Sequence, residues 1–416
     1  MKNLTVFLLS SFVFFTACTS DANKELKNQS LTAIQEGDYN LAISRIEEGL
    51  QKAPDDAELH YFMGQAYREL QFKDGSQINQ LNLEMGEKAS AAFRKAIEIS
   101  PDYKGRKFVV GPYTKIQSIW GAIAMAYIEA GDNEAAVKAF KRGRAEGGFF
   151  PAMMEYNKNI MASCEPNAII FTNGDNDTYP MWYLQLVDGY RKDINVVNLS
   201  LLNVPWYIKQ LKNTYPFGNN RIALELTDAE IEALKPQKWQ TQTVAIPGSE
   251  TDNEISWSLS PTIKDVALRV QDLMVLNILN DNKWQRPVYF SSTVAQVNKM
   301  NLNSYLRFEG LVLRLVSEKQ DMSVELLQKN CFDVYTYDGV KDKNFQYVDE
   351  LHSMYQNYRA GFMLLADYYA RESNMPEVAH TIEFMNQKLP EKLYPWQNPK
   401  QKKYAENLLL KANEAI

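Results

Sequence analysis

The feature of this 416-residue chain that most restricts its fold is a skeleton of large and small residues that occurs twice in the first third. Within residues 57–101 the skeleton consists of His60, Met63, Gly64, Tyr67, Ala89, Phe93, Ala96 and Pro101. Within residues 117–147 it consists of Trp120, Ile123, Ala124, Tyr127, Ala136, Phe140 and Gly143. Residues spaced three and four apart lie on one face of a helix. The skeleton therefore predicts pairs of antiparallel helices, with small residues where the helices touch.

This skeleton resembles the tetratricopeptide repeat, a family of stacked helical hairpins. A weaker copy in "EGDYNLAISRIEEGL" adds a third predicted hairpin, and three is the usual minimum for a stable stack. The resemblance implies a concave surface that holds a protein partner, and the alternative is that the helices only brace the rest of the chain. An insertion within "QFKDGSQINQLNLEM" falls at the turn inside the second hairpin, where it would project and contact a partner.

The N-terminus has the pattern of an export signal. Lys2 precedes an apolar run that ends at Phe15, and Cys18 follows directly after a Thr-Ala pair. This run is shorter than the roughly 20 apolar residues that span a bilayer, and it is typical of a secretory signal peptide. A cysteine in this context resembles the lipobox of bacterial lipoproteins, with Phe15 in place of the more usual leucine. The resemblance implies a signal peptide over 1–17, lipidation of Cys18 and a polar tether over 18–27; the alternative is an ordinary signal peptide with an incidental cysteine.

Lipidation at Cys18 implies an exported protein that is anchored to the bacterial cell envelope. The outer membrane is favoured over the inner one, and the protein is expected to face the periplasm or the cell surface. The chain has 45 Lys and Arg residues against 51 Asp and Glu residues, which gives a net charge of −6, and it has no long basic run. Nucleic acid is therefore not expected as a partner.

The sequence contains no recognisable catalytic or metal-binding arrangement. Its three histidines are far apart and lack metal-ligand spacing. Cys164 and Cys331 have no histidine nearby, and the sequence leaves open whether they form a disulfide or remain two buried thiols. No phosphate-binding loop and no Ser-His-Asp arrangement can be assembled. We therefore predict no cofactor, no metal and no catalytic residue, and favour a non-catalytic protein over an enzyme.

From residue 165 onward, short β-prone runs alternate with helical patterns. "AIIFT" (168–172) and "INVVNLS" (194–200) have the character of buried parallel strands, and 178–190 between them predicts a helix. The strongest helical pattern covers 261–281, with a serine N-cap and a proline at the first position. It leads into the strand candidate "RPVYFSST", and "GLVLRLVS" (310–317) is predicted to be an edge strand.

In open α/β sheets, ligands collect at the carboxyl ends of the strands. The candidate ligand-binding residues after the expected strands are Asn173, Asp175, Asp177, Asn203, Trp206, Tyr207, Ser291 and Thr293. Carboxylates beside aromatic faces suit a sugar or another polyol, and paired carboxylates also suit Mg²⁺ or Ca²⁺. The alternative is that Asp177 is the N-cap of the helix that follows it, and this structural role is the more economical explanation of the acidic turn.

Three blocks in this region are similar to the soluble, extracytoplasmic C-terminal part of a bacterial family. The blocks are "NAIIFTNGDNDTYPMWYLQLVDGYRKDINVVNLSLLNVPWYIKQLK", "DLMVLNILNDNKWQRPVYFSSTV" and "SYLRFEGLVLRLV", which together cover about 165–320. Members of that family are multi-pass membrane proteins that are protein O-mannosyltransferase-like and otherwise of unknown function. This chain lacks the transmembrane portion to which glycosyl transfer is attributed, so the resemblance implies a shared accessory domain rather than a transferase.

The predicted architecture is multidomain, α and α/β. It consists of tetratricopeptide-type hairpins over 28–150, an α/β domain with a mostly parallel sheet over 165–320, and a C-terminal helical hairpin region over 350–416. We expect a membrane-anchored lipoprotein that acts as a non-catalytic interaction or scaffold module, in cell-envelope or glycan assembly. The alternative is a glycan-binding or carbohydrate-active protein with a ligand or metal site at the strand ends.

Overall fold

The computed structural model describes residues 23–71, 81–342 and 348–416. Its contacts divide the chain into a helical unit that ends at Phe149 and a larger unit from Phe150 to Ile416. Cys18 and most of the insertion that follows Gln71 lie outside the described residues. In the described parts of the chain, no helix combines the length and the apolar character that crossing a membrane requires.

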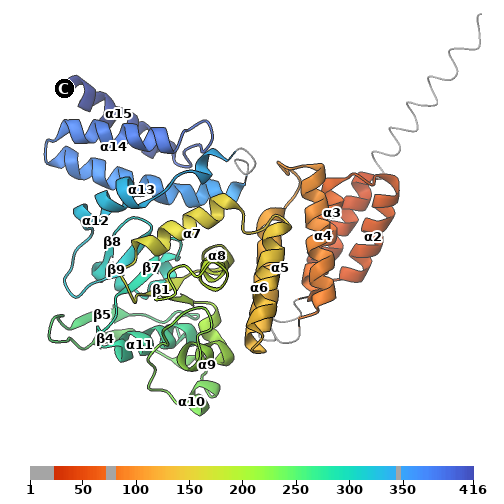
Figure 1. The fold of residues 1–416 in the computed structure, drawn as a ribbon, viewed down its shortest axis with the longest axis horizontal. Helices are drawn as coiled ribbons and strands as arrows, with labels where there is room; N and C mark the ends of the chain where they lie inside the picture. The colour runs from red at the N-terminus through yellow and green to blue at the C-terminus, as the bar shows by residue number, and fades with distance from the viewer. Residues whose placement is uncertain (1–22, 72–80, 343–347) are drawn as a thin grey trace, which may run out of the picture. The chain divides into compact units, whose positions relative to one another are not determined.

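The helical unit is a series of antiparallel helices (Figure 1). A helix over 23–36 is followed by α2 (Tyr39–Lys52), α3 (Ala57–Gln71), α4 (Leu83–Ile99), α5 (Pro112–Glu129) and α6 (Asn133–Ala145). From α2 onward each helix packs on the next. The tetratricopeptide-type hairpins expected from the sequence are therefore confirmed.

The small residues of the repeat skeleton lie where helices approach closely. A Cβ atom added to Gly64 would lie 2.9 Å from the ring of Phe93, and one added to Gly143 would lie 2.5 Å from Cβ of Trp120. Ala136 is fully buried. Larger side chains at these positions would push the helices apart, which explains why the skeleton alternates large and small residues.

Two of the hairpin turns use the same Gly-Asp pair. Gly37 and Gly131 have φ angles of 81° and 79°, a region that glycine enters without steric cost. Each is followed by an aspartate, Asp38 or Asp132, whose side chain accepts a backbone hydrogen bond from the first turn of the next helix. The pair thus ends one helix and starts the next.

The larger unit is built on a five-stranded sheet with the strand order β2-β1-β7-β9-β8. The strands are β1 (Ile169–Thr172), β2 (Asn195–Asn198), β7 (Val288–Ser291), β8 (Leu306–Phe308) and β9 (Val312–Leu315). β1 pairs in parallel with β2 and β7, whereas β9 pairs antiparallel with β7 and β8. Every residue of β1, β2 and β7 is buried, which is typical of parallel strands inside an α/β unit. The predicted α/β class is confirmed, with a mixed sheet.

Helices lie beside this sheet, and the last three helices of the chain are stacked at one end of the unit (Figure 1). The helices are α7 (Pro151–Ser163), α8 (Asp175–Leu186), α9 (Pro205–Asn213), α10 (Asp228–Glu232), α11 (Val270–Asn282), α12 (Val324–Lys329), α13 (Asp349–Arg371), α14 (Met375–Lys388) and α15 (Pro399–Ala415). Two small antiparallel sheets pair β3 (Gln237–Lys238) with β6 (Ala267–Leu268) and β4 (Gln242–Ile246) with β5 (Ile255–Leu259). The finer boundaries expected at 165–320 and 350–416 stay predictions.

The helix expected over 261–281 is wrong in its first half. Lys264 and Asp265 have φ angles of 45° and 57°, and the chain then forms β6 before α11 begins. The helix starts where it does because the carboxylate of Asp272 accepts a hydrogen bond from the backbone N–H of Arg269, 3.1 Å away. The apolar spacing before this point reflects a strand contact rather than a helical face.

The edge position expected for 310–317 is also wrong. β9 lies between β7 and β8, so it is an inner strand, and β8 forms that edge of the sheet. The strand β8 is only three residues long, and its sequence carries little periodic signal. A short edge strand of this kind limits pairing with other chains.

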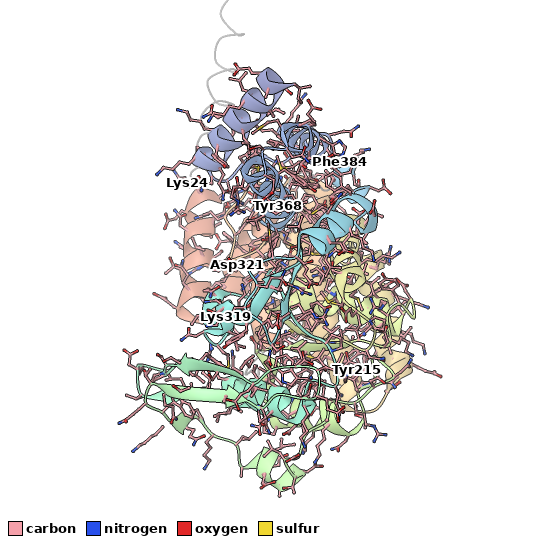
Figure 2. All side chains as sticks on the ribbon, turned by 90° about the vertical axis from the view of Figure 1, so that its left-hand side faces the viewer. Lys24, Tyr215, Lys319, Asp321, Tyr368 and Phe384 are labelled. Atoms are coloured by element: carbon pink, nitrogen blue, oxygen red, sulfur yellow. The ribbon has the colours of Figure 1, made fainter. Side chains whose placement is uncertain are left out.

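The C-terminal helical hairpin expected from the sequence is present. α13 and α14 are joined at a turn in which Ser373 has a φ of 57°. Figure 2 shows Tyr368 and Phe384 on these two helices, and Lys319 and Asp321 on the loop after β9. The α14 helix packs against both α13 and α15.

Candidate functional site

The candidate site lies where the chain leaves the sheet in opposite directions. After β1 the chain enters α8 and returns as β2 on one side, whereas after β7 it continues to β8 and β9 on the other side. In α/β sheets a crevice for ligands forms at such a switch point, outside the carboxyl ends of the strands. The residues that follow β1 and β7 therefore lie where such a crevice would form.

Asp177 is a buried carboxylate at this point, with 2% of its surface exposed. Its carboxylate accepts hydrogen bonds from the backbone N–H groups of Asn173 and Gly174, both at 2.8 Å, and from the hydroxyl of Thr293. The expectation that Asp177 is the N-cap is wrong, because Gly174 occupies that position and Asp177 lies at the third helical residue. From this position its side chain accepts a hydrogen bond from the backbone N–H of the N-cap residue, as the acidic partner in a capping box does.

Burial raises the pKa of Asp177, because removal from water disfavours its charged form more than the hydrogen bonds favour it. Three intramolecular donors already point at this carboxylate. These contacts give Asp177 a clear structural role, and ligand binding by this group stays a prediction.

A second hydrogen-bonded group connects the ends of β1 and β2. The hydroxyls of Thr172 and Thr178 lie 2.7 Å apart, and the side-chain amide of Asn198 donates to Thr178 at 2.9 Å. Asn198 also accepts a hydrogen bond from the backbone N–H of Leu201. Sequence reasoning missed Asn198, which is the last residue of β2 and pairs with Thr172, the last residue of β1, in the register of the sheet.

Amide side chains from separate segments of the chain, including the first turn of α11, meet at the same edge of the sheet. Asn203 exchanges two hydrogen bonds with Gln271, each 3.0 Å long. Asn298 donates to Asn173 at 3.4 Å and accepts from the guanidinium of Arg269 at 2.9 Å. Sequence reasoning missed both Gln271, which lay inside the helix expected over 261–281, and Asn298, which lies five residues beyond the end of the expected strand at Thr293.

The other predicted site residues lie in different surroundings. Ser291 and Thr293 share a 2.7 Å hydrogen bond beside Asp177. Tyr207 lies in the core with 1% exposure, and its hydroxyl accepts from the backbone N–H of Asn198. Trp206 is partly exposed, and its indole N–H has no hydrogen-bond partner among the described residues. Asp175 is the first residue of α8 and is partly exposed.

The structure thus brings Asp177, Ser291 and Thr293 into one cluster, links Asn173 and Asn203 to an amide network, and places Tyr207 in the core. Within the described ranges, no group of three or more His, Cys, Asp and Glu side chains is arranged to hold a metal ion. Cys164 and Cys331 are buried free thiols, so they do not form a disulfide.

Fold and site together define a class: a tetratricopeptide-type helical unit followed by an α/β unit with a C-terminal helical hairpin. A model of the tetratricopeptide repeat matches residues 117–143, within α5 and α6. A model of TMEM260-associated domain 2 matches residues 153–242 and 235–334, from α7 through the sheet. Among curated proteins, none matches the chain. The chain therefore contains a tetratricopeptide repeat and a region similar to TMEM260-associated domain 2.

Proposed function

We propose that this protein is an exported lipoprotein that holds a protein partner at the bacterial cell envelope and does not itself catalyse a reaction. The observation that carries the proposal is the stack of helical hairpins, in which 117–143 match the tetratricopeptide repeat. Arrays of this kind commonly bind other proteins through surfaces that several helices build together. The partner would belong to cell-envelope or glycan assembly.

A hydrogen-bonded cluster supports this role because it joins three helices of the stack. The indole N–H of Trp120 on α5 donates to the hydroxyl of Ser90 on α4 at 2.8 Å, and that hydroxyl donates to Glu146 at the end of α6. The guanidinium of Arg142 lies over the Trp120 ring at 4.6 Å. A rigid surface loses less conformational entropy when it binds a partner.

The anchoring part of the proposal rests on the N-terminal sequence. Residues 23–27, which the sequence assigned to the tether, instead form the start of the helix over 23–36. A lipidated Cys18 five residues before this helix would hold the hairpins close to a membrane surface. The outer membrane is favoured over the inner one, with the protein facing the periplasm or the cell surface.

Photo-crosslinking in intact cells tests the interaction. A photoreactive amino acid is placed at Lys138 or Lys141, which are exposed on α6, and at Lys238, which is exposed on β3, as a matched control. We expect both α6 positions to capture the same protein and the β3 position not to capture it. If neither α6 position yields a reproducible partner, the interaction role is wrong.

Metabolic labelling with an alkyne fatty acid tests the anchor. We expect the wild-type chain to be labelled and to sediment with membranes, and we expect Cys18→Ser to abolish both results. Cys164→Ser is the control and should leave the label in place. Recovery of unlabelled wild-type protein from the cytosol with residues 1–17 still attached would contradict the anchor.

Glycan binding is a second candidate function, and the amide network at the strand ends is the observation that favours it. Side-chain amides both donate and accept hydrogen bonds, as recognition of sugar hydroxyls requires. Asn298→Ala removes the amide that connects Asn173 with Arg269, and Asn213→Ala on α9 is the control. Screening on a glycan array should show binding that only Asn298→Ala reduces; absence of any bound glycan excludes this function.

A further inference from the structure

A cavity of about 460 Å³ lies at the opposite edge of the sheet from the candidate site. Its walls include the start of β7, the end of β9, the last turn of α11 and the loop between β4 and β5. Because β9 runs antiparallel to β7, the end of one strand and the start of the other meet at this edge. Its lining includes Arg286, Arg307, Arg314, Trp284, Gln285 and Asp252.

Two of the arginines face each other across adjacent strands. Arg307 of β8 and Arg314 of β9 are directly paired in the register of the sheet. Like charges in this position destabilise a sheet unless something compensates them. Arg307 has a dedicated counterion, because the buried carboxylate of Glu309 accepts from its guanidinium at 2.6 and 2.9 Å.

Arg314 is much less completely paired. Within the described ranges, one of its nitrogens donates a hydrogen bond, to the half-exposed carboxylate of Glu165. Its other N–H groups have no protein acceptor among the described residues, although its side chain is only 25% exposed. A guanidinium has five donors in a planar fork, so Arg314 retains the geometry that grips an oxyanion.

Arg286 adds a further positive charge, and among the described residues no carboxylate accepts a hydrogen bond from it. Its guanidinium donates to the carbonyls of Asn167, Ala168 and Arg221 and to the side-chain oxygen of Asn195, at distances from 2.5 to 3.2 Å. All four acceptors are neutral. Asp193 acts on Arg286 electrostatically, but Asp193 is itself paired with Arg191, so within the described residues the charge of Arg286 at the cavity wall has no dedicated counterion.

Two carboxylates also line the cavity, but neither neutralises these arginines. Asp252 accepts hydrogen bonds from the hydroxyls of Thr251 and Ser317, at 2.9 and 3.3 Å. Glu318 is exposed to solvent. Within the described part of the chain, neither acid forms an ion pair with an arginine of the cavity.

We propose that this cavity binds the oxyanion group, a phosphate or a carboxylate, of a small molecule, with Arg314 as the main anchor. Its volume lies in the range of small-molecule sites, which is about 300 to 1,000 Å³. Trp284 offers a flat face for the remainder of the ligand, and its ring is held by a 2.8 Å hydrogen bond to the carbonyl of Pro247. This site is separate from the proposed protein-binding surface and from the strand ends that sequence reasoning favoured.

Calorimetric titration of the full mature chain with inorganic phosphate and with malonate, at constant ionic strength set by chloride, tests the proposal. We expect saturable binding of at least one probe. Arg314→Gln should weaken it by about tenfold or more, and Arg314→Lys by less, because lysine keeps the charge but loses the fork. Arg221→Gln, which changes an exposed arginine outside the cavity, should leave the affinity unchanged.

A second variant protects the test against a folding defect in the first. Gln285 lines the cavity, is exposed and makes no side-chain hydrogen bond within the described chain, so Gln285→Glu should fold normally and weaken binding through charge repulsion. Preference for phosphate or for malonate supports the site and identifies the ligand class. No saturable binding of either probe, or binding that Arg314→Gln and Gln285→Glu both leave unchanged, overturns the proposal.

Discussion

The carboxylate of Asp177 accepts a hydrogen bond from the hydroxyl of Thr293, which lies 116 residues further along the chain. The same carboxylate caps the start of α8 through two backbone N–H groups. One side chain therefore connects the end of β1 with the end of β7 at the point where the chain leaves the sheet in opposite directions.

Asp177→Ala should lower the free energy of unfolding by about 1–3 kcal/mol, because it leaves buried donors without an acceptor. Thr293→Val should cost less, since the two backbone donors keep their partner. Urea denaturation followed by tryptophan fluorescence measures both effects. Asp188→Ala, at an exposed carboxylate, is the control and should change stability by no more than about 0.5 kcal/mol. An Asp177→Ala variant as stable as the control would remove the capping role.

Gly143→Ala should destabilise the contact between α5 and α6. Alanine normally stabilises a helix by about 1 kcal/mol relative to glycine, but here its Cβ would lie 2.5 Å from Cβ of Trp120, which cannot move without the backbone. We expect a net loss of about 1–2 kcal/mol from overpacking. Hydrogen exchange of the α5 and α6 amides measures it locally, with the exposed Lys138→Ala as control. Slower exchange in Gly143→Ala would contradict the close approach.

Arg286→Lys should lower stability by about 2–4 kcal/mol even though it keeps the charge. The guanidinium donates to four acceptors around the amino ends of the parallel strands, and a lysine cannot reach all of them from one nitrogen. Chemical denaturation of Arg286→Lys beside Arg221→Lys measures the difference. Equal stability of the two variants would show that the fork is not needed.

Lys299→Met should stabilise the protein at neutral pH, by about 1 kcal/mol. Lys299 is 9% exposed, has no ion pair within the described chain, and burial lowers its pKa. The folded state therefore binds its proton less tightly than the unfolded state, and the wild type gains stability as pH rises from the lowered pKa to the unfolded value of about 10.4. The advantage of Lys299→Met should shrink over that window. Urea titrations at pH 7 and pH 10 check this, and an advantage that grows with pH would contradict the sign.

The thiols of Cys164 and Cys331 should resist modification in the native protein. Both are buried, and burial raises the pKa of each above its ordinary value, so little reactive thiolate forms. A maleimide reagent should label a Cys18→Ser chain only after denaturation, when mass spectrometry should find both sites modified. Rapid labelling of the folded chain would show that one thiol is accessible.

Several residues of the candidate site could be predicted from the sequence, because polar residues directly after buried strands lie at the carboxyl edge of a sheet. Asn173, Asp177 and Thr293 were found in this way. Gln271 and Asn298 were not, since neither directly follows a buried strand that the sequence predicted, and only the tertiary structure brings them to Asn203 and Asn173. Asp177 was predicted to be the N-cap but is the third residue of the helix, because α8 begins earlier than its apolar spacing indicated.

The sequence alone determined the helical hairpins and the buried strands, because spacings of three and four residues and short apolar runs are properties of neighbouring residues. Tertiary structure decided which distant groups meet. The pairing of β8 with β9 places Arg307 opposite Arg314, and the pairing of β7 with β1 brings Thr293 to Asp177. Contacts between residues far apart in the chain depend on strand order and register, which a local pattern does not encode.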